Sequence, residues 1–170
     1  FALRDRSLKP VRSFWLEQTE YPLTPSALVH AHDKWFVAGY RSLKEEHPHA
    51  RAALVSVYDA EGRLIAAPLC WEGDMRDGVQ HLRSFLSADG DRVWCMQEGN
   101  LRVNVFASAD GALVKQADLP VSPGYRPFPE HSYRGLVDQP VQALLKGMQE
   151  IHESHSPIAA LVVAQGRILV

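Results

Sequence analysis

The chain has 170 residues, of which 46% are hydrophobic and 22% are charged. These values are typical of soluble folded proteins, so they exclude intrinsic disorder and allow a core without metal or disulfide staples. Eighteen lysines and arginines against 20 aspartates and glutamates give a net charge of -2, which argues against nucleic acid as a partner. The longest apolar runs, such as 158–164, are far shorter than the roughly 18 residues of a membrane span, which argues against a membrane.

The two ends of the chain lack the marks of a full gene product. The sequence begins at Phe1 instead of an initiator methionine and stops at 168–170, within a predicted strand. We therefore expect a processed or trimmed product.

The segment 1–25 mixes basic residues with a short apolar run at 14–16 and then turns through Pro22 and Pro25. This pattern predicts one short strand with an extended lead-in, whose role is to pack on the rest of the chain.

From residue 27 the sequence predicts a unit of four strands. These short runs of β-branched and aromatic residues lie at 27–32, 35–40, 53–58 and 63–69. Asp33 and Lys34 form the predicted two-residue turn of the first hairpin, and Gly62 supplies the positive φ of the second turn. The charged segment 41–51 between the hairpins is predicted to be a loop.

The same plan returns in the segment 81–119. Its four predicted strands lie at 81–87, 92–96, 101–107 and 112–119, with a glycine in each separator. Overlaying the units places Trp35 on Trp94, 57–58 on 105–106, and Gly62 near Gly111. The resulting period of roughly 50 residues falls among the known repeat architectures.

Two such four-strand meanders, each with a bulky residue opening the second strand, resemble the blades of a β-propeller of the quinoprotein or WD-like kind. The resemblance covers segments 27–69 and 81–119. Propellers close with about four to eight blades, so two or three units imply a propeller-like fragment or a half-ring completed by a partner chain. An open sheet or a sandwich is the alternative arrangement of the same strands.

The remaining third of the chain changes character. Segment 121–136 combines three prolines with aromatic residues and is predicted to be an extended strap. Apolar residues then recur with a helical period, which predicts one amphipathic helix over 139–153. A hairpin formed by 158–164 and 167–170 follows it. The predicted organisation is therefore β units over 1–120, the strap, and a helix with a terminal hairpin over 137–170, a mainly β fold with one C-terminal helix.

The apolar stripe of the predicted helix consists of Val141, Leu144, Leu145, Met148 and Ile151. It is wide enough to need an apolar surface, and the β units are the only such surface that the sequence offers. The prediction is that Leu145→Ala costs about 2 to 5 kcal/mol.

His30 and His32 are the candidates for a metal site. Two histidines at i and i+2 of a strand point to one face and could hold zinc, as in the paired histidines that metallohydrolases carry. The sequence has neither a histidine after Asp33 nor a later run of ligands. We therefore expect a solvent-facing pair at the end of a hairpin, and no metal or other cofactor is assigned.

The sequence assigns no catalytic residue. It contains no Gly-x-Ser-x-Gly elbow and no glycine-rich phosphate loop. Cys70 and Cys95 are too few for a disulfide framework, lack zinc-site spacing and assign no compartment. Each adjoins a tryptophan, at 71 and 94, which predicts buried and inert thiols.

A second resemblance concerns the terminal hairpin. Segment 158–169, which follows an amphipathic helix, resembles the opening hairpin of serine β-lactamase-like hydrolases. The Ser-x-x-Lys motif of that family is absent, so no catalytic residue is carried over. The resemblance implies that the chain is the N-terminal part of a longer enzyme.

The leading hypothesis is a non-enzymatic protein-interaction module, such as an inhibitor, an immunity-type protein or an assembly protein, whose partner is another protein chain. The candidate contact residues are those of types that often anchor interfaces: Tyr125, Arg126, Phe128, Tyr133 and Arg134. The alternative is a hydrolase, with zinc on His30 and His32 or as part of a longer serine enzyme.

Overall fold

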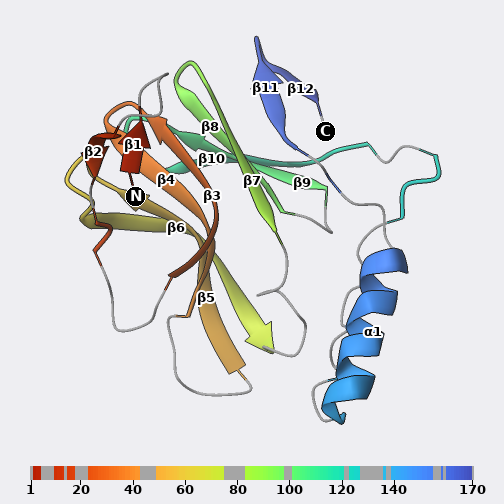
Figure 1. Cartoon of the computed structure of the whole chain (residues 1–170). Helices are drawn as coiled ribbons and strands as arrows, with labels where there is room; N and C mark the ends of the chain where they lie inside the picture. The colour runs from red at the N-terminus through yellow and green to blue at the C-terminus, as the bar shows by residue number, and fades with distance from the viewer. Residues whose placement is uncertain are drawn as a thin grey trace.

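The structure is a computed structural model that describes residues 2–4, 10–13, 15–17, 23–42, 49–74, 83–97, 101–120, 123–126, 136, 139–154, 158 and 160–169. The elements in chain order are β1 (Ala2–Arg4), β2 (Pro10–Ser13), β3 (Leu23–Ala31), β4 (Lys34–Ser42), β5 (His49–Tyr58), β6 (Leu64–Asp74), β7 (Ser84–Asp89), β8 (Arg92–Gln97), β9 (Arg102–Ala107), β10 (Leu113–Asp118), α1 (Val141–Ser154), β11 (Val162–Ala164) and β12 (Arg167–Leu169). This order confirms the predicted mainly β fold with one C-terminal helix (Figure 1).

Each predicted group of four strands forms one antiparallel four-stranded sheet. The first sheet has the order β3-β4-β5-β6 and the second the order β10-β9-β8-β7, so neighbours in the chain are neighbours in the sheet. The pairs β1–β2 and β11–β12 form two further sheets of two strands each. The N-terminal segment differs from the prediction of one short strand, because it contains two short strands, β1 and β2.

The first hairpin turns one residue earlier than predicted. His32 and Asp33 both have left-handed φ values, 50° and 61°, while Lys34 already pairs with Ala31. Two consecutive left-handed residues match the twist of a tight hairpin, which explains why the turn forms at His32 and Asp33. The predicted turn at Asp33 and Lys34 is therefore wrong by one position.

The predicted loop over 41–51 is shorter than expected, because β4 continues to Ser42 and β5 begins at His49. Arg41 consequently lies in a strand and is only 2% exposed. β3 likewise begins before residue 27 and includes Pro25, which an edge strand tolerates because its outer side needs no N–H donor.

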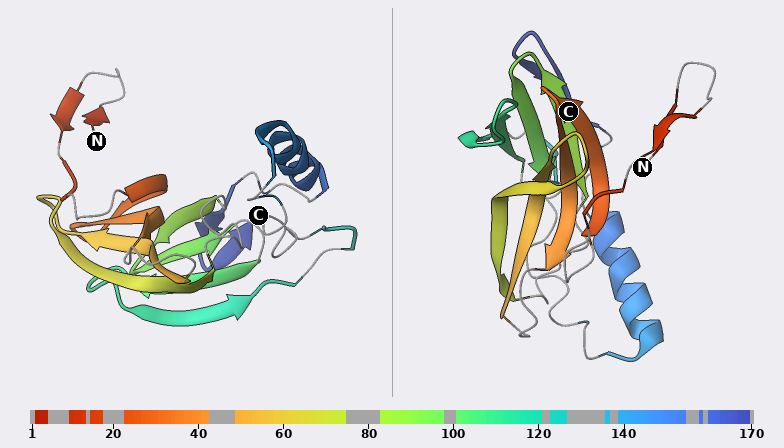
Figure 2. Two further views of the ribbon diagram at one scale, coloured as in Figure 1. Left: turned by 90° about the horizontal axis from the view of Figure 1, so that it is seen from below. Right: turned by 90° about the vertical axis from the view of Figure 1, so that its left-hand side faces the viewer.

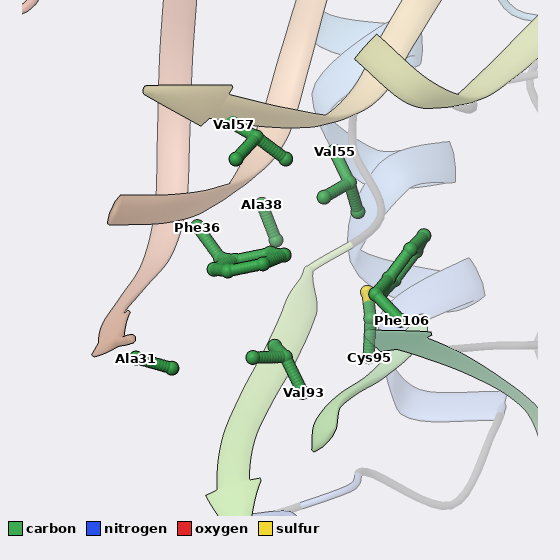
Figure 3. Packing of buried hydrophobic residues seen from close by; sticks show 8 residues of the cluster. All are labelled: Ala31, Phe36, Ala38, Val55, Val57, Val93, Cys95 and Phe106. Carbon is green, nitrogen blue, oxygen red and sulfur yellow. The ribbon is translucent and has the colours of Figure 1, made fainter. Parts of the chain in front are cut away.

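The two four-stranded sheets stack face to face. Their shared core contains buried side chains from both sheets, which converge in Figure 3: Ala31, Phe36, Ala38, Val55, Val57, Val93, Cys95 and Phe106. The first strands β3 and β7 lie side by side and are joined by Ser26, whose Oγ accepts a hydrogen bond from the Ser84 amide at 3.2 Å. The core between the sheets therefore depends on both of them.

Each sheet is also covered on its other face. The outer face of the first sheet carries buried Trp35, Val37 and Tyr58, with Leu16 packed against them. The far face of the second sheet carries Met96 and its neighbours, and the β11–β12 hairpin packs there. Because both faces of each sheet are apolar, the side chains along β4 and β8 are buried almost without a break.

The pairing registers of the two sheets correspond to each other, but they are shifted by one residue from the predicted overlay of Trp35 on Trp94. The corresponding pairs are Trp35↔Tyr58 with Val93↔Phe106, and Phe36↔Val57 with Trp94↔Val105. The overlay of 57–58 on 105–106 agrees with this register. The overlay of Trp35 on Trp94 does not, because Trp35 occupies the position of Val93 and the two indoles belong to opposite faces of their sheets.

Helix α1 begins two residues after its predicted start and stands apart from the two stacked sheets (Figures 1 and 2). Val141 and Leu145 are 69% and 60% exposed. Gly147 faces Leu136, whose Cδ2 atom lies 2.5 Å from the place that a Cβ would take. The prediction that Leu145 packs on the β units, and that its truncation costs about 2 to 5 kcal/mol, is therefore wrong.

Within the described residues no helix is long and apolar enough to cross a membrane.

Candidate functional site

His30 and His32 are both exposed at the end of the first hairpin, which confirms the solvent-facing positions expected for them. His30 lies on β3, where its ring stacks on Trp35 with centroids 4.4 Å apart and planes tilted by 52°. His32 lies beyond the strand, in the turn, with φ 50°. The left-handed backbone breaks the alternation of the strand, so the argument that places both imidazoles on one face does not apply. Across the described part of the chain, no three His, Cys, Asp or Glu side chains come together in a way that could hold a metal ion.

The strap residues divide into three groups. Tyr125 is half-buried and packs against the apolar cluster on the far face of the second sheet. Arg126 beside it is exposed. Phe128, Tyr133 and Arg134 lie outside the described residues. The ring of Tyr125 therefore covers the protein's own core, and Arg126 is exposed.

Arg41 is a buried charge that the sequence reasoning missed. The residue is only 2% exposed, and its Nε and Nη1 atoms have no hydrogen-bond partner within the described structure. Burial raises the pKa of the Tyr58 phenol, while the positive charge of Arg41 acts in the opposite direction. The only signal in the sequence was that Arg41 directly follows an apolar strand, which also suits the first residue of a loop.

The two thiols differ in environment. Cys95 lies in the core between the sheets, where burial raises its pKa to about 12. Cys70 on β6 is half-buried, and its Sγ lies 3.4 Å from the carbonyl oxygen of Ala67. A thiol without a thiolate form at neutral pH is a poor nucleophile, so Cys95 is structural.

We expect a thiol reagent at pH 8 to modify Cys70 in the folded chain and Cys95 only after unfolding, because Cys95 is both buried and protonated. The measurement is thiol titration with and without denaturant on the wild type and on Cys70→Ala. Cys70→Ala should show no accessible thiol until it unfolds. Rapid labelling of folded Cys70→Ala would contradict the assignment.

Large apolar side chains are exposed at five places among the described residues. These are Trp15 (86%) after β2, Ile65 (50%) on β6, Leu113 (38%) and Val114 (51%) on β10, Val141 (69%) and Leu145 (60%) on α1, and Val162 (50%) and Leu169 (69%) on the β11–β12 hairpin. The α1 stripe is the set Val141, Leu144, Leu145, Met148 and Ile151. Its members Leu144, Met148 and Ile151 are half-buried, so the stripe is covered along one edge and open along the other.

Comparison with known proteins gives no match: no family model, curated protein or solved structure is significantly similar to this chain.

Proposed function

We propose that this chain is a protein-interaction module without an enzymatic activity of its own, and that it contacts another protein chain through the open edge of the α1 stripe. The observation that carries the proposal is the exposure of Val141 and Leu145, 69% and 60%, on one face of a helix outside the β body. Apolar side chains at i and i+4 are the usual anchors of a helix that enters a groove of a partner.

The polar face of α1 supports the helix without the partner. Gln149 donates a hydrogen bond to Glu153 at 2.6 Å, and the Lys146 ammonium lies 3.7 Å from the Glu150 carboxylate. Such i,i+4 pairs stabilise a helix by a few tenths of a kcal/mol each. A preformed helix loses less conformational entropy on binding than a disordered segment, which favours its use as a recognition element.

The β body suits the role of a rigid scaffold. We infer a propeller-like stack, because adjacent first strands β3 and β7 meet and successive sheets share apolar faces. We propose the exposed Arg126 of the strap as a further contact residue, in addition to the stripe. An inhibitor, an immunity-type protein and an assembly protein are the kinds of module that combine such a scaffold with one apolar anchor.

Leu145→Lys is expected to change the free energy of unfolding by less than about 0.5 kcal/mol, because the side chain is mostly exposed, while it abolishes partner binding. The measurements are thermal denaturation of the isolated chain and affinity capture from the native source, with mass spectrometry of the captured chain. Ala143→Lys is the control, since it adds the same charge at an exposed position on the side of α1 away from Leu145. A partner that binds wild type and Leu145→Lys equally well would refute the α1 interface.

A further inference from the structure

The side chain of Arg41 places a positive charge inside the first sheet. β4 is an inner strand of that sheet, and Arg41 pairs with Leu23 of β3 on one side and with Ala53 of β5 on the other. The residue is 2% exposed, and among the described residues none accepts a hydrogen bond from its Nε or Nη1 atom. A guanidinium stays protonated, so it cannot escape the cost of burial by losing its charge, as a lysine can. A buried charge of this kind needs an acceptor.

Two exposed arginines show how the same group is paired elsewhere in the chain. The Nε atom of Arg63 lies 2.7 Å from Oδ2 of Asp59, and that of Arg102 lies 2.8 Å from Oδ1 of Asp118. The two arginine side chains are 73% and 52% exposed, so water solvates them as well. Arg41 lacks that second source of solvation, because an unpaired charge costs far more in the interior than at the surface. The requirement for an anion is therefore greater at Arg41 than at either surface pair.

Two buried hydroxyl groups belong to the same part of the first sheet. Ser56 and Tyr58 are each 1% exposed and lie two residues apart on β5, so they share a face of the strand. The Oγ atom of Ser56 finds no hydrogen-bond partner in the described part of the chain. Burial raises the pKa of the Tyr58 phenol and the charge of Arg41 lowers it, so these two groups lie close together. Along β5, Ser56 stands between Tyr58 and Ala53, the residue that pairs with Arg41. We call Arg41, Ser56 and Tyr58 the Arg41 cluster.

A described carboxylate near this cluster is already engaged. Glu17 also acts on the Tyr58 phenol, whose pKa it raises. Its Oε2 atom accepts a hydrogen bond from the Leu64 amide at 2.7 Å, and Leu64 pairs with Tyr58 at the end of β5 that is remote from Ala53. The cluster therefore combines a positive charge with N–H and O–H donors. The complementary group is an anion whose oxygens only accept, a carboxylate or a phosphate.

We propose that the Arg41 cluster binds a small oxyanion, a carboxylate or a phosphate, whose oxygens accept hydrogen bonds from the Arg41 guanidinium and the Ser56 hydroxyl. The planar guanidinium matches the geometry of both groups. Because the cluster is closed to solvent, the ion has the size of acetate or inorganic phosphate, and its entry requires a local opening of the side chains around it. The cluster lies in the β body and α1 stands apart from that body, so this binding is independent of the proposed α1 interface (Figure 1).

The test is thermal denaturation of the purified chain in chloride buffer, with inorganic phosphate or acetate added at constant ionic strength. An ion that binds only the folded chain should raise the melting temperature by about 5 to 10 °C at about a hundredfold excess over its dissociation constant. Arg41→Met should abolish this shift, and it should fold because an apolar side chain of similar length tolerates burial. Arg102→Met is the matched control, since it removes an exposed guanidinium and should keep the shift. Comparison with Arg41→Met also removes the general stabilisation that phosphate gives to folded proteins.

The Tyr58 phenol gives a second measurement that does not depend on stability. A bound anion offsets the charge of Arg41, so the pKa of this phenol should rise in the presence of the ion. Absorbance titration follows it, with Tyr58→Phe to identify its signal, and Arg41→Met should show no such rise.

Ser56→Ala is a second variant of the site and should raise the dissociation constant by up to about tenfold. Shifts with phosphate alone assign a phosphate group, shifts with acetate alone assign a carboxylate, and shifts with both support the shared oxyanion chemistry. The proposal is overturned if neither ion changes the wild type, or if the wild type and Arg41→Met respond equally. Binding through α1 is scored separately with Leu145→Lys, so either proposal can fail without the other.

Discussion

Phe36→Ala is expected to lower the free energy of unfolding by about 3 to 5 kcal/mol. Phe36 is 0% exposed and packs between the sheets, with its ring centroid 6.4 Å from that of Phe106 on the second sheet. Truncation removes the buried ring and leaves a cavity that Val93 and Cys95 on the facing strand can fill only in part, because a sheet backbone resists collapse (Figure 3).

The measurement is urea denaturation followed by circular dichroism, with Ile65→Ala as the control. Ile65 is on β6 and is 50% exposed, so its truncation should cost about 1 kcal/mol or less. Because the core around Phe36 contains side chains of both sheets, we expect a single unfolding transition, whose midpoint moves to a lower urea concentration in Phe36→Ala. A second transition that stays in place in Phe36→Ala would mean that the second sheet folds without the first.

The strands and the helix could be predicted because their apolar periods differ. Segments such as 53–58 and 101–107 are rich in β-branched residues, and the stripe from Val141 to Ile151 follows a period near 3.6. Short glycine-containing separators then fix which strands are neighbours, since a hairpin can join only adjacent antiparallel strands. This is why the two four-stranded sheets were recovered with their strand order.

The register of the first hairpin could not be predicted, because its turn uses His32 and Asp33 in left-handed conformations. Histidine and aspartate adopt positive φ more often than most residues but far less readily than glycine, and no glycine marks the position. The one-residue error removed the basis of the paired-histidine site. The overlay of Trp35 on Trp94 is wrong by one residue for a separate reason: it matches the two tryptophans and not the strand registers, and a shift of one residue exchanges the two faces of a strand.

The sequence shows which face of an element is apolar, but it does not show which surface that face contacts. The stripe of α1 shows which face of the helix is apolar, whereas its distance from the sheets depends on the path of the chain before residue 139. Arg41 is the reverse case, a charged residue that the extension of β4 carries into the interior. In both cases the tertiary arrangement overrides a local preference, and a single sequence holds no signal for it.

Gly62→Ala is expected to destabilise the chain by about 2 to 5 kcal/mol, the sum of a backbone effect and a steric one. Gly62 has φ +87°, a conformation that costs an L-residue about 1 to 2 kcal/mol. A Cβ at this position would lie 2.2 Å from the carbonyl oxygen of Trp15. The Glu17 amide donates to the Gly62 carbonyl at 2.7 Å, so the methyl group would push residues 15–17 off the β5–β6 turn.

Gly90→Ala separates the two effects, because Gly90 also has a left-handed φ, +58°, but has no atom within 4 Å of the added Cβ. It should cost only the backbone part, about 1 to 2 kcal/mol. Urea denaturation of both variants gives the difference, which measures how firmly Trp15 and Glu17 are held against the turn. If the two variants lose the same free energy of unfolding, residues 15–17 move away from the added Cβ without a measurable loss of stability. The larger effect at Gly62 is expected because the Glu17 carboxylate also accepts a hydrogen bond from the Leu64 amide at 2.7 Å, so displacing the segment breaks contacts on both sides of the glycine.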